Sequence, residues 1–230
     1  MKNLIITALG VALFVALAIG ILVALKQVSS QPSVILTSTN CEPPCWYGIQ
    51  PGKTNYLEIT GLLEQISGLN ERNILWDFDK KDRLASVHWT FQRPIDDSLG
   101  YIYFDDDKIV NAIKIYTINS LKISDVFKKL GEPELFWTEI GKRESRDEFL
   151  EVFLLYPAKG YLVDCIVNIE YGNTQVELKE NTPIYLVTYF APEAYNQLLE
   201  TQILIDKSVN TRSGTPRPWP GLGLIPVGNK

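Results

Sequence analysis

An uncharged, strongly apolar run near the start of the chain is the feature that most constrains its fold. From Leu4 to Leu25 the sequence reads LIITALGVALFVALAIGILVAL, 22 consecutive residues without a charged side chain. As an α-helix this run would span roughly 33 Å, enough to cross a bilayer core of about 30 Å. We therefore expect residues 1–26 to be a transmembrane helix that anchors the chain. A cleaved signal peptide is the alternative, although its apolar region is usually only about 7–15 residues long.

The rest of the sequence predicts a folded body with a polar segment at each end. Residues 27–40 carry no charge and predict a stalk, and residues 206–230 are rich in Gly and Pro and predict a C-terminal tail. The formal net charge is −5 and no cluster of basic residues is present, which argues against binding to nucleic acid. We expect a single-pass protein of the cell membrane with its body outside the cytoplasm.

Between these ends the same order of elements is predicted twice. Apolar residues recur with helical spacing at 56–66 and again at 123–130. Strand-like runs follow the first helix at 74–78, 84–91, 100–104 and 109–116, and the second at 134–139, 148–156, 161–170 and 183–190. A short closing helix begins at Pro192. The expected fold class is α+β: after the transmembrane helix come two tandem units of one helix and an antiparallel meander, residues 41–118 and 119–205.

Alternation along the predicted strands assigns each side chain to one face of a sheet. In the run at 84–91, for example, Val87 and Trp89 point away from His88. The pattern gathers five residues on the face opposite the helices: His88, Tyr101, Tyr103, Lys114 and Tyr116. Such a mixture of amphipathic aromatic and polar side chains suits recognition of another surface. The alternative is an ordinary solvated sheet face.

Two cysteines, Cys41 and Cys45, enclose two prolines in the stretch NCEPPCWYGIQPGKT. A thioredoxin-type redox site needs two residues between its cysteines and a helix N-terminus that lowers a thiol pKa, and neither is predicted here. A zinc site needs three or four ligands, and only Cys165 and His88 remain as further candidates. We expect a Cys41–Cys45 disulfide. A Cys45–Cys165 bridge that ties the two units together is the alternative.

No pattern of residues predicts a catalytic, cofactor or metal site. His88 is the only histidine, and neither a Ser-His-Asp nor a His-Glu-x-x-His arrangement surrounds it. The acidic groups at 96–97 and 105–107 could serve glycoside hydrolysis or calcium binding, but adjacent acids of this kind usually form solvated turns. We therefore expect no enzymatic activity, no cofactor and no metal.

The Pro/Gly-rich tail contains a segment, PWPGLGLIP, that we expect to dock on the body. Trp219 can bury about 150–250 Å² of surface, and the flanking prolines reduce the entropy lost when the segment becomes ordered. Gly221 and Gly223 would let the backbone lie close to a strand edge. The alternative is a disordered tail.

Three motifs resemble those of a family of uncharacterised, membrane-anchored extracytoplasmic bacterial proteins. The run PCWYGIQPGKT matches the family signature Pro-Cys-Trp-x-Gly-Ile-x-Pro-Gly-x-Thr, and WPGLG at 219–223 approximates its Trp-x-Gly-Phe-Gly element. The family's mid-chain Leu-x-Ile/Leu-x-Asp-Val-x-x-x-Leu-Gly-x-Pro motif is matched by Leu121, Ile123, Asp125, Val126, Leu130, Gly131 and Pro133. More distantly, each predicted unit resembles the SmpA/BamE module of outer-membrane assembly lipoproteins, and the pair resembles β-lactamase inhibitor protein.

These distant resemblances imply a protein-binding module without catalysis. We therefore expect a membrane-tethered, extracytoplasmic protein-binding or envelope scaffold module, whose partner is another envelope protein or an envelope polymer. Two alternatives stay open: an extracytoplasmic hydrolase that uses acidic residues, and a passive structural spacer.

Overall fold

The structure is a computed structural model that describes only part of the chain. The described residues are 34–36, 41–66, 69, 71–79, 84–90, 99–117, 121–142, 148–170, 173–200 and 215–227. The predicted transmembrane segment, most of the predicted stalk and the acidic pair at 96–97 lie outside them. No helix within the described residues is both long enough and apolar enough to cross a membrane.

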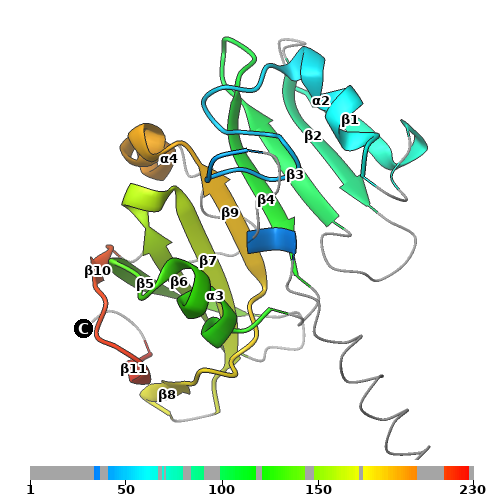
Figure 1. The fold of residues 1–230 in the computed structure, drawn as a ribbon. Coiled ribbons are helices and arrows are strands. Elements are labelled where there is room, and N and C mark those ends of the chain that lie inside the picture. The colour runs from blue at the N-terminus through cyan, green and yellow to red at the C-terminus, as the bar shows by residue number, and fades with distance from the viewer. Residues whose placement is uncertain are drawn as a thin grey trace, which may run out of the picture. The chain divides into compact units, whose positions relative to one another are not determined.

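One antiparallel sheet dominates the described residues (Figure 1). Its nine described strands lie side by side in the order β1-β2-β3-β4-β9-β7-β6-β5-β10. Their bounds are β1 (Ile74–Phe78), β2 (Leu84–Thr90), β3 (Leu99–Phe104), β4 (Val110–Tyr116), β5 (Leu135–Lys142), β6 (Glu148–Tyr156), β7 (Tyr161–Asn168), β9 (Leu186–Phe190) and β10 (Arg217–Pro218). Two more strands, β8 (Gln175–Leu178) and β11 (Gly223–Pro226), form a separate antiparallel pair.

The helices of the described part are short. They are α2 (Tyr56–Leu63), α3 (Ile123–Leu130) and α4 (Tyr195–Glu200), and four 3-10 turns are η1 (Val34–Leu36), η2 (Glu71–Asn73), η3 (Pro157–Lys159) and η4 (Pro192–Ala194). Asn55 and Glu58 start α2 with a capping box, in which each side chain accepts a hydrogen bond from a backbone N–H. Gly131 ends α3 with a positive φ of 77°, which glycine adopts without steric cost.

Helices α2 and α3 pack on one and the same side of the sheet (Figure 1). Ile59 and Leu63 of α2 and Val126 of α3 are fully buried, and they share a core cluster with strand residues such as Val163. Complete burial of one such side chain contributes about 1.5–3 kcal/mol, far more than the intrinsic propensity of an eight-residue helix. The sheet therefore holds these short helices in place.

The expected fold class is wrong. The described chain is mostly antiparallel sheet with three short helices, instead of two tandem α+β units, and none of the described helices could cross a membrane. The two predicted meanders are parts of one sheet, because β9 pairs with β4 on one side and with β7 on the other. Every residue of β9 is buried, as expected for a strand that joins two halves of a sheet.

The C-terminal segment docks as predicted. β10 pairs with β5 at the end of the large sheet, and β11 pairs with β8. Between them, the Trp219 ring makes edge contacts with Phe127 and Phe136 at centroid distances of 6.1 and 5.6 Å. The described part of the tail is therefore packed against the body.

The N-terminal part of the body is held by an aromatic stack next to the cysteine pair. Cys41 and Cys45 are paired at disulfide distance, with 6.1 Å between their Cα atoms, and Cys165 is free and buried. Trp46 is buried and stacks on Trp89 of β2 with 4.8 Å between ring centroids. The predicted Cys41–Cys45 pairing is therefore present, and its position fixes the entry of the chain into the core.

Candidate binding face

The side of the sheet opposite α2 and α3 carries a continuous group of aromatic rings. Four of them come from β2, β3 and β4, and one precedes β9: His88, Tyr101, Tyr103, Tyr116 and Tyr185, which we call the aromatic face. Tyr101 contacts three of the other rings, and Tyr185 joins through Tyr116; the centroid distances are 5.3–6.3 Å. These distances lie within the range over which aromatic rings attract one another.

The strand register builds this face. His88 lies opposite Tyr101, and Tyr103 lies opposite Ser86, so side chains from neighbouring strands point to the same side. The residues between them, such as Val87 and Ile102, point into the core and are fully buried. The structure thus brings together four of the five residues expected from the sequence and adds Tyr185, which is 42% exposed.

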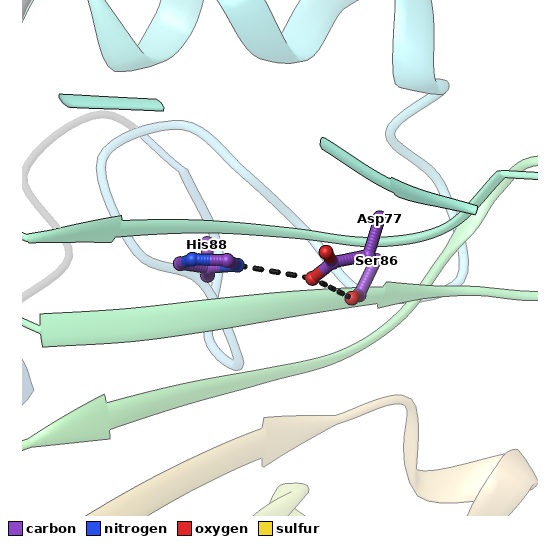
Figure 2. Close-up of polar contacts among 3 residues, drawn as sticks. All are labelled: Asp77, Ser86 and His88. Carbon is purple, nitrogen blue, oxygen red and sulfur yellow. Dashed lines mark hydrogen bonds and ion pairs between the residues drawn. The ribbon is translucent and has the colours of Figure 1, made fainter. Parts of the chain in front are cut away.

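His88 is oriented by a carboxylate on the neighbouring strand. Its Nδ1 donates a hydrogen bond to Asp77 Oδ2 at 3.0 Å, and Ser86 Oγ donates to the same oxygen at 3.2 Å (Figure 2). Because a carboxylate can only accept hydrogen bonds, Nδ1 carries the proton. Although serine, histidine and aspartate meet here, both the serine and the histidine bind the aspartate. A nucleophilic serine would instead have to be hydrogen-bonded to the histidine.

Lys114, the fifth residue expected on the face, lies on the same side of the sheet but is only 3% exposed. Its Nζ lies 5.4 Å from the centroid of the Tyr103 ring, within the range of a cation–π interaction. Lys114 therefore supports the aromatic face through Tyr103 and offers little accessible surface of its own.

Beyond Lys114, the same side of the sheet buries three carboxyl groups: Glu139 on β5, Glu151 on β6 and Asp164 on β7, which we call the acidic cluster. Glu139 and Glu151 lie directly opposite each other in the ladder. Asp164 is 1% exposed, and the carboxyl of another acid, Glu151, lies close enough to share a hydrogen bond with it. Two buried carboxyl groups share a hydrogen bond only when one of them is protonated, so this site favours the protonated, neutral form of Asp164.

The electrostatics of Asp164 follow from these neighbours. Burial is the largest cause that raises its pKa well above the ordinary value, and the negative charges of Glu151 and Glu139 add to the effect. The positive charge of Lys114 acts in the opposite direction. Among the described residues, no group of three or more His, Cys, Asp or Glu is arranged to hold a metal ion. The acidic cluster can hold protons, and its residues do not form a metal centre.

The rest of this side is covered by α4. A second hydrophobic cluster lies there, comprising Trp137, Phe153, Leu155, Leu162, Phe190 and Leu198. Leu198 belongs to α4 and is fully buried against the strand residues. One side of the sheet is therefore closed over its second half and presents aromatic rings over its first half.

The two other candidates from the sequence, Asp105 and Cys165, belong to a turn and to the core. Asp105 lies in the tight turn between β3 and β4, where its Oδ1 accepts a hydrogen bond from the Ile109 N–H. Burial raises the pKa of the Cys165 thiol, which therefore stays protonated and is a poor nucleophile.

Sequence reasoning missed Asp77 and Tyr185. Alternation along the run at 183–190 puts Tyr185 on the side of Val187 and Tyr189, which face the core, so the period of that strand gives no signal for its contact with Tyr116.

Comparisons with known proteins give little beyond this geometry. No family model matches the chain, and no curated protein matches it. Among solved structures, the chain is similar to the crystal structure of a DUF4309 family protein (YjgB) from Bacillus subtilis, with 8% sequence identity and a TM-score of 0.28. The match covers 63% of this chain and 83% of that chain. A likeness with so low a TM-score carries no argument about fold or function.

Proposed function

We propose that this chain is an extracytoplasmic binding module, held at the cell membrane by its apolar N-terminal segment, that recognises another envelope protein or polymer through the aromatic face. The observation that carries the proposal is the aromatic face itself, five contiguous rings on one side of a sheet. Tyrosine is enriched at recognition surfaces because its ring offers apolar area and its hydroxyl offers a hydrogen bond. No catalysis is part of the proposal.

The cysteine pair supports the location. Disulfides form and persist in oxidising compartments outside the cytoplasm, and Cys41 and Cys45 lie at disulfide distance. Residues 44–54 resemble the signature of a family of membrane-anchored extracytoplasmic proteins, and this resemblance points to the same location. The apolar run at 4–25 supplies the means of attachment.

Preorganisation of the rings supports binding. Each ring of the aromatic face already contacts another ring, and the hydrogen bond to Asp77 orients His88 before any partner arrives. Rigid aromatic side chains lose little conformational entropy on association, so more of the contact energy is available for affinity.

Site-specific photo-crosslinking in the full-length, membrane-bound chain tests the proposal. A photoreactive amino acid in place of Tyr103 or Tyr185 should capture the same partner. The same amino acid in place of Leu224, which is 65% exposed on β11, serves as the control and should not. Adding Tyr101→Ser should lower the yield about tenfold or more, since a central aromatic contact contributes about 2 kcal/mol or more to binding.

Two outcomes would contradict the proposal. Equal capture at Leu224 would show that the aromatic face is not the recognition surface. The absence of any specific adduct at both face positions would favour a passive spacer.

A further inference from the structure

Asp77 is an exposed charge beside the aromatic face. It belongs to β1, and its Oδ2 accepts hydrogen bonds from His88 and Ser86 on β2 (Figure 2). The side chain nevertheless remains 54% exposed. Because a carboxylate can accept about four hydrogen bonds, Asp77 keeps acceptor capacity that a partner can use.

The described part of the aromatic face has no exposed lysine or arginine to balance this charge. Lys114, which lies among its rings, is only 3% exposed. The rings add to the negative character of the surface, since the face of an aromatic ring carries negative partial charge. The formal net charge of the whole chain, −5, has the same sign. A partner that complements this surface carries positive charge.

The carboxylate and the rings lie close enough to act on one cation. His88 stands between them: its Nδ1 is 3.0 Å from Asp77 Oδ2, and its ring centroid is 5.3 Å from that of Tyr101. An aromatic ring attracts a cation within about 6 Å of its centroid, and a carboxylate binds one at hydrogen-bond distance. A planar guanidinium placed over His88 can therefore meet both conditions.

The chain already places cations of its own against tyrosine rings. Lys114 Nζ lies 5.4 Å from the centroid of Tyr103, and Lys108 Nζ lies 4.8 Å from the centroid of Tyr56. Lys114 is buried, so it does not compete for the solvent side of the aromatic face. A cation that reaches Tyr101 and Asp77 from that side has to come from a partner.

We propose that the aromatic face binds an arginine side chain in a basic segment of the partner protein, with the guanidinium stacked on Tyr101 and hydrogen-bonded to Asp77. This inference rests on the proposed function and names the chemistry of the partner. Arginine fits better than lysine, because its planar fork binds a carboxylate and also stacks on an aromatic ring. Leu75 lies opposite His88 in the ladder and is 52% exposed, so it offers an apolar surface for the methylene stem of the arginine.

Photo-crosslinking of a defined peptide to the full-length chain in a non-ionic detergent tests this contact. A photoreactive amino acid replaces Leu75, which leaves Asp77 and every ring of the aromatic face in place. The probe is a short biotinylated peptide of arginine, glycine and serine, and the control probe has citrulline, the uncharged isostere, in place of each arginine. The apparent dissociation constant, measured from capture at increasing peptide concentration, should be at least about fivefold lower for the arginine peptide. The same photoreactive amino acid in place of Leu224 should show no such preference.

Two variants separate the carboxylate from the ring. Asp77→Asn removes the charge but keeps an oxygen that can accept from His88 and Ser86, and it should raise the apparent dissociation constant of the arginine peptide about two- to fivefold. Asp107→Asn removes the same charge from the exposed turn between β3 and β4 and should change nothing. Tyr101→Leu should weaken arginine binding by a similar two- to fivefold, as expected for about one cation–π contact. Circular dichroism should show that all variants remain folded.

Equal capture of the arginine and citrulline peptides would overturn the inference, as would equal effects of Asp77→Asn and Asp107→Asn. An uncharged oligosaccharide of N-acetylglucosamine that displaces the arginine peptide, with no effect of Asp77→Asn, would identify a glycan as the occupant instead. The inference and the proposed function fail separately. Capture of an envelope partner at Tyr103 or Tyr185 without arginine-dependent peptide binding refutes the inference alone. Arginine-dependent peptide binding without capture of any envelope partner refutes the proposed function and leaves the arginine site.

Discussion

Replacement of Asp164 by Asn should make the protein more stable at neutral and alkaline pH and flatten the pH dependence of its stability. Asp164 lies on β7 and is almost completely buried, next to the carboxyl group of Glu151. The titratable groups that act on it come from three strands: Glu151 on β6, Glu139 on β5 and Lys114 on β4. Two of the three are acids, so the neighbourhood disfavours a third negative charge.

The sign of the effect follows from the direction of the pKa shift. The pKa of Asp164 in the folded protein lies well above the value of about 3.9 expected for an unfolded chain, and burial is the main cause. Between those two pKa values the folded state binds more protons than the unfolded state. The contribution of this group to stability is therefore complete below about pH 4 and is lost as the pH rises through the folded pKa.

The same linkage sets an upper limit on the stability that the ionised Asp164 can cost. Each pH unit between the two pKa values costs about 1.4 kcal/mol, so at pH 7 the cost of Asp164 cannot exceed about 4 kcal/mol. Asparagine is neutral at every pH and avoids this cost. Its amide also needs hydrogen-bond partners, and an unsatisfied buried amide costs about 1–3 kcal/mol. We expect a net gain of about 1–2 kcal/mol for Asp164→Asn at pH 7–8, diminishing toward about pH 4.

Urea unfolding of the full-length chain in detergent, followed by circular dichroism from about pH 4.5 to 9, measures this difference. Asp107→Asn is the matched control, since Asp107 is exposed in the turn between β3 and β4. The control should leave both the stability and its slope with pH unchanged. The reasoning is refuted if Asp164→Asn is less stable than the wild type at pH 8, or if its slope with pH equals that of the wild type.

Three further substitutions test the packing. Gly160→Ala should lower the free energy of unfolding by at least about 2 kcal/mol in urea titrations, because φ is +73° and a Cβ would lie 2.2 Å from a backbone carbonyl oxygen; an unchanged midpoint would contradict the tight turn. Trp219→Ala should cost about 2 kcal/mol and lower the melting temperature, since two ring contacts are lost; no change would mean that the tail does not stabilise the body. Replacement of both Cys41 and Cys45 by serine should lower the free energy of unfolding by about 2 kcal/mol, as expected for so short a closed loop. A non-reducing peptide map that links Cys45 to Cys165 would refute the pairing.

The positions of strands and helices were predictable because the spacing of apolar residues nearby in the sequence determines them. The strands β1 and β6 occupy the residues expected from alternation and apolar runs, and α2 begins where the helical spacing of apolar residues begins, at Tyr56. Alternation also placed His88, Tyr101 and their neighbours on the correct side of the sheet. These predictions depend on residues close together in the sequence, where the period of the side chains decides the outcome.

Long-range pairing was not predictable in the same way. The β4–β9 ladder joins residues far apart in the sequence, such as Lys114 and Thr188, and nothing in the period of either strand names the other as its partner. The outer edges of both predicted meanders were available for pairing, so tandem units and one continuous sheet fit the same pattern. Burial of all of β9 distinguishes the two, and it is seen only in the folded chain.

Alternation gives the side of the sheet but not whether that side is covered. Alternation along the run at 161–170 puts Asp164 on the side opposite Val163 and Cys165, and it does point away from α2 and α3, yet it is buried. The sequence of the second half contains the missing signal. β6 reads EFLEVFLLY and is apolar on both sides, with Phe153 and Leu155 on the side that alternation calls outward. A strand that is apolar on both sides is covered on both sides.

The presence of apolar residues on both sides of a strand also distinguishes the two halves of the sheet side that faces away from α2 and α3. In the first half its positions hold His88, Tyr101 and Tyr103, which combine apolar rings with polar groups and remain partly exposed. In the second half they hold large apolar residues that α4 covers. Glu151 and Asp164 lie on the same side of β6 and β7 and are buried as well, and Asp164 is directly opposite the apolar Phe153. The burial that raises the pKa of Asp164 is therefore a consequence of the apolar residues around it in β6 and β7, and a sequence test that counts apolar residues on both sides of each strand would have found it.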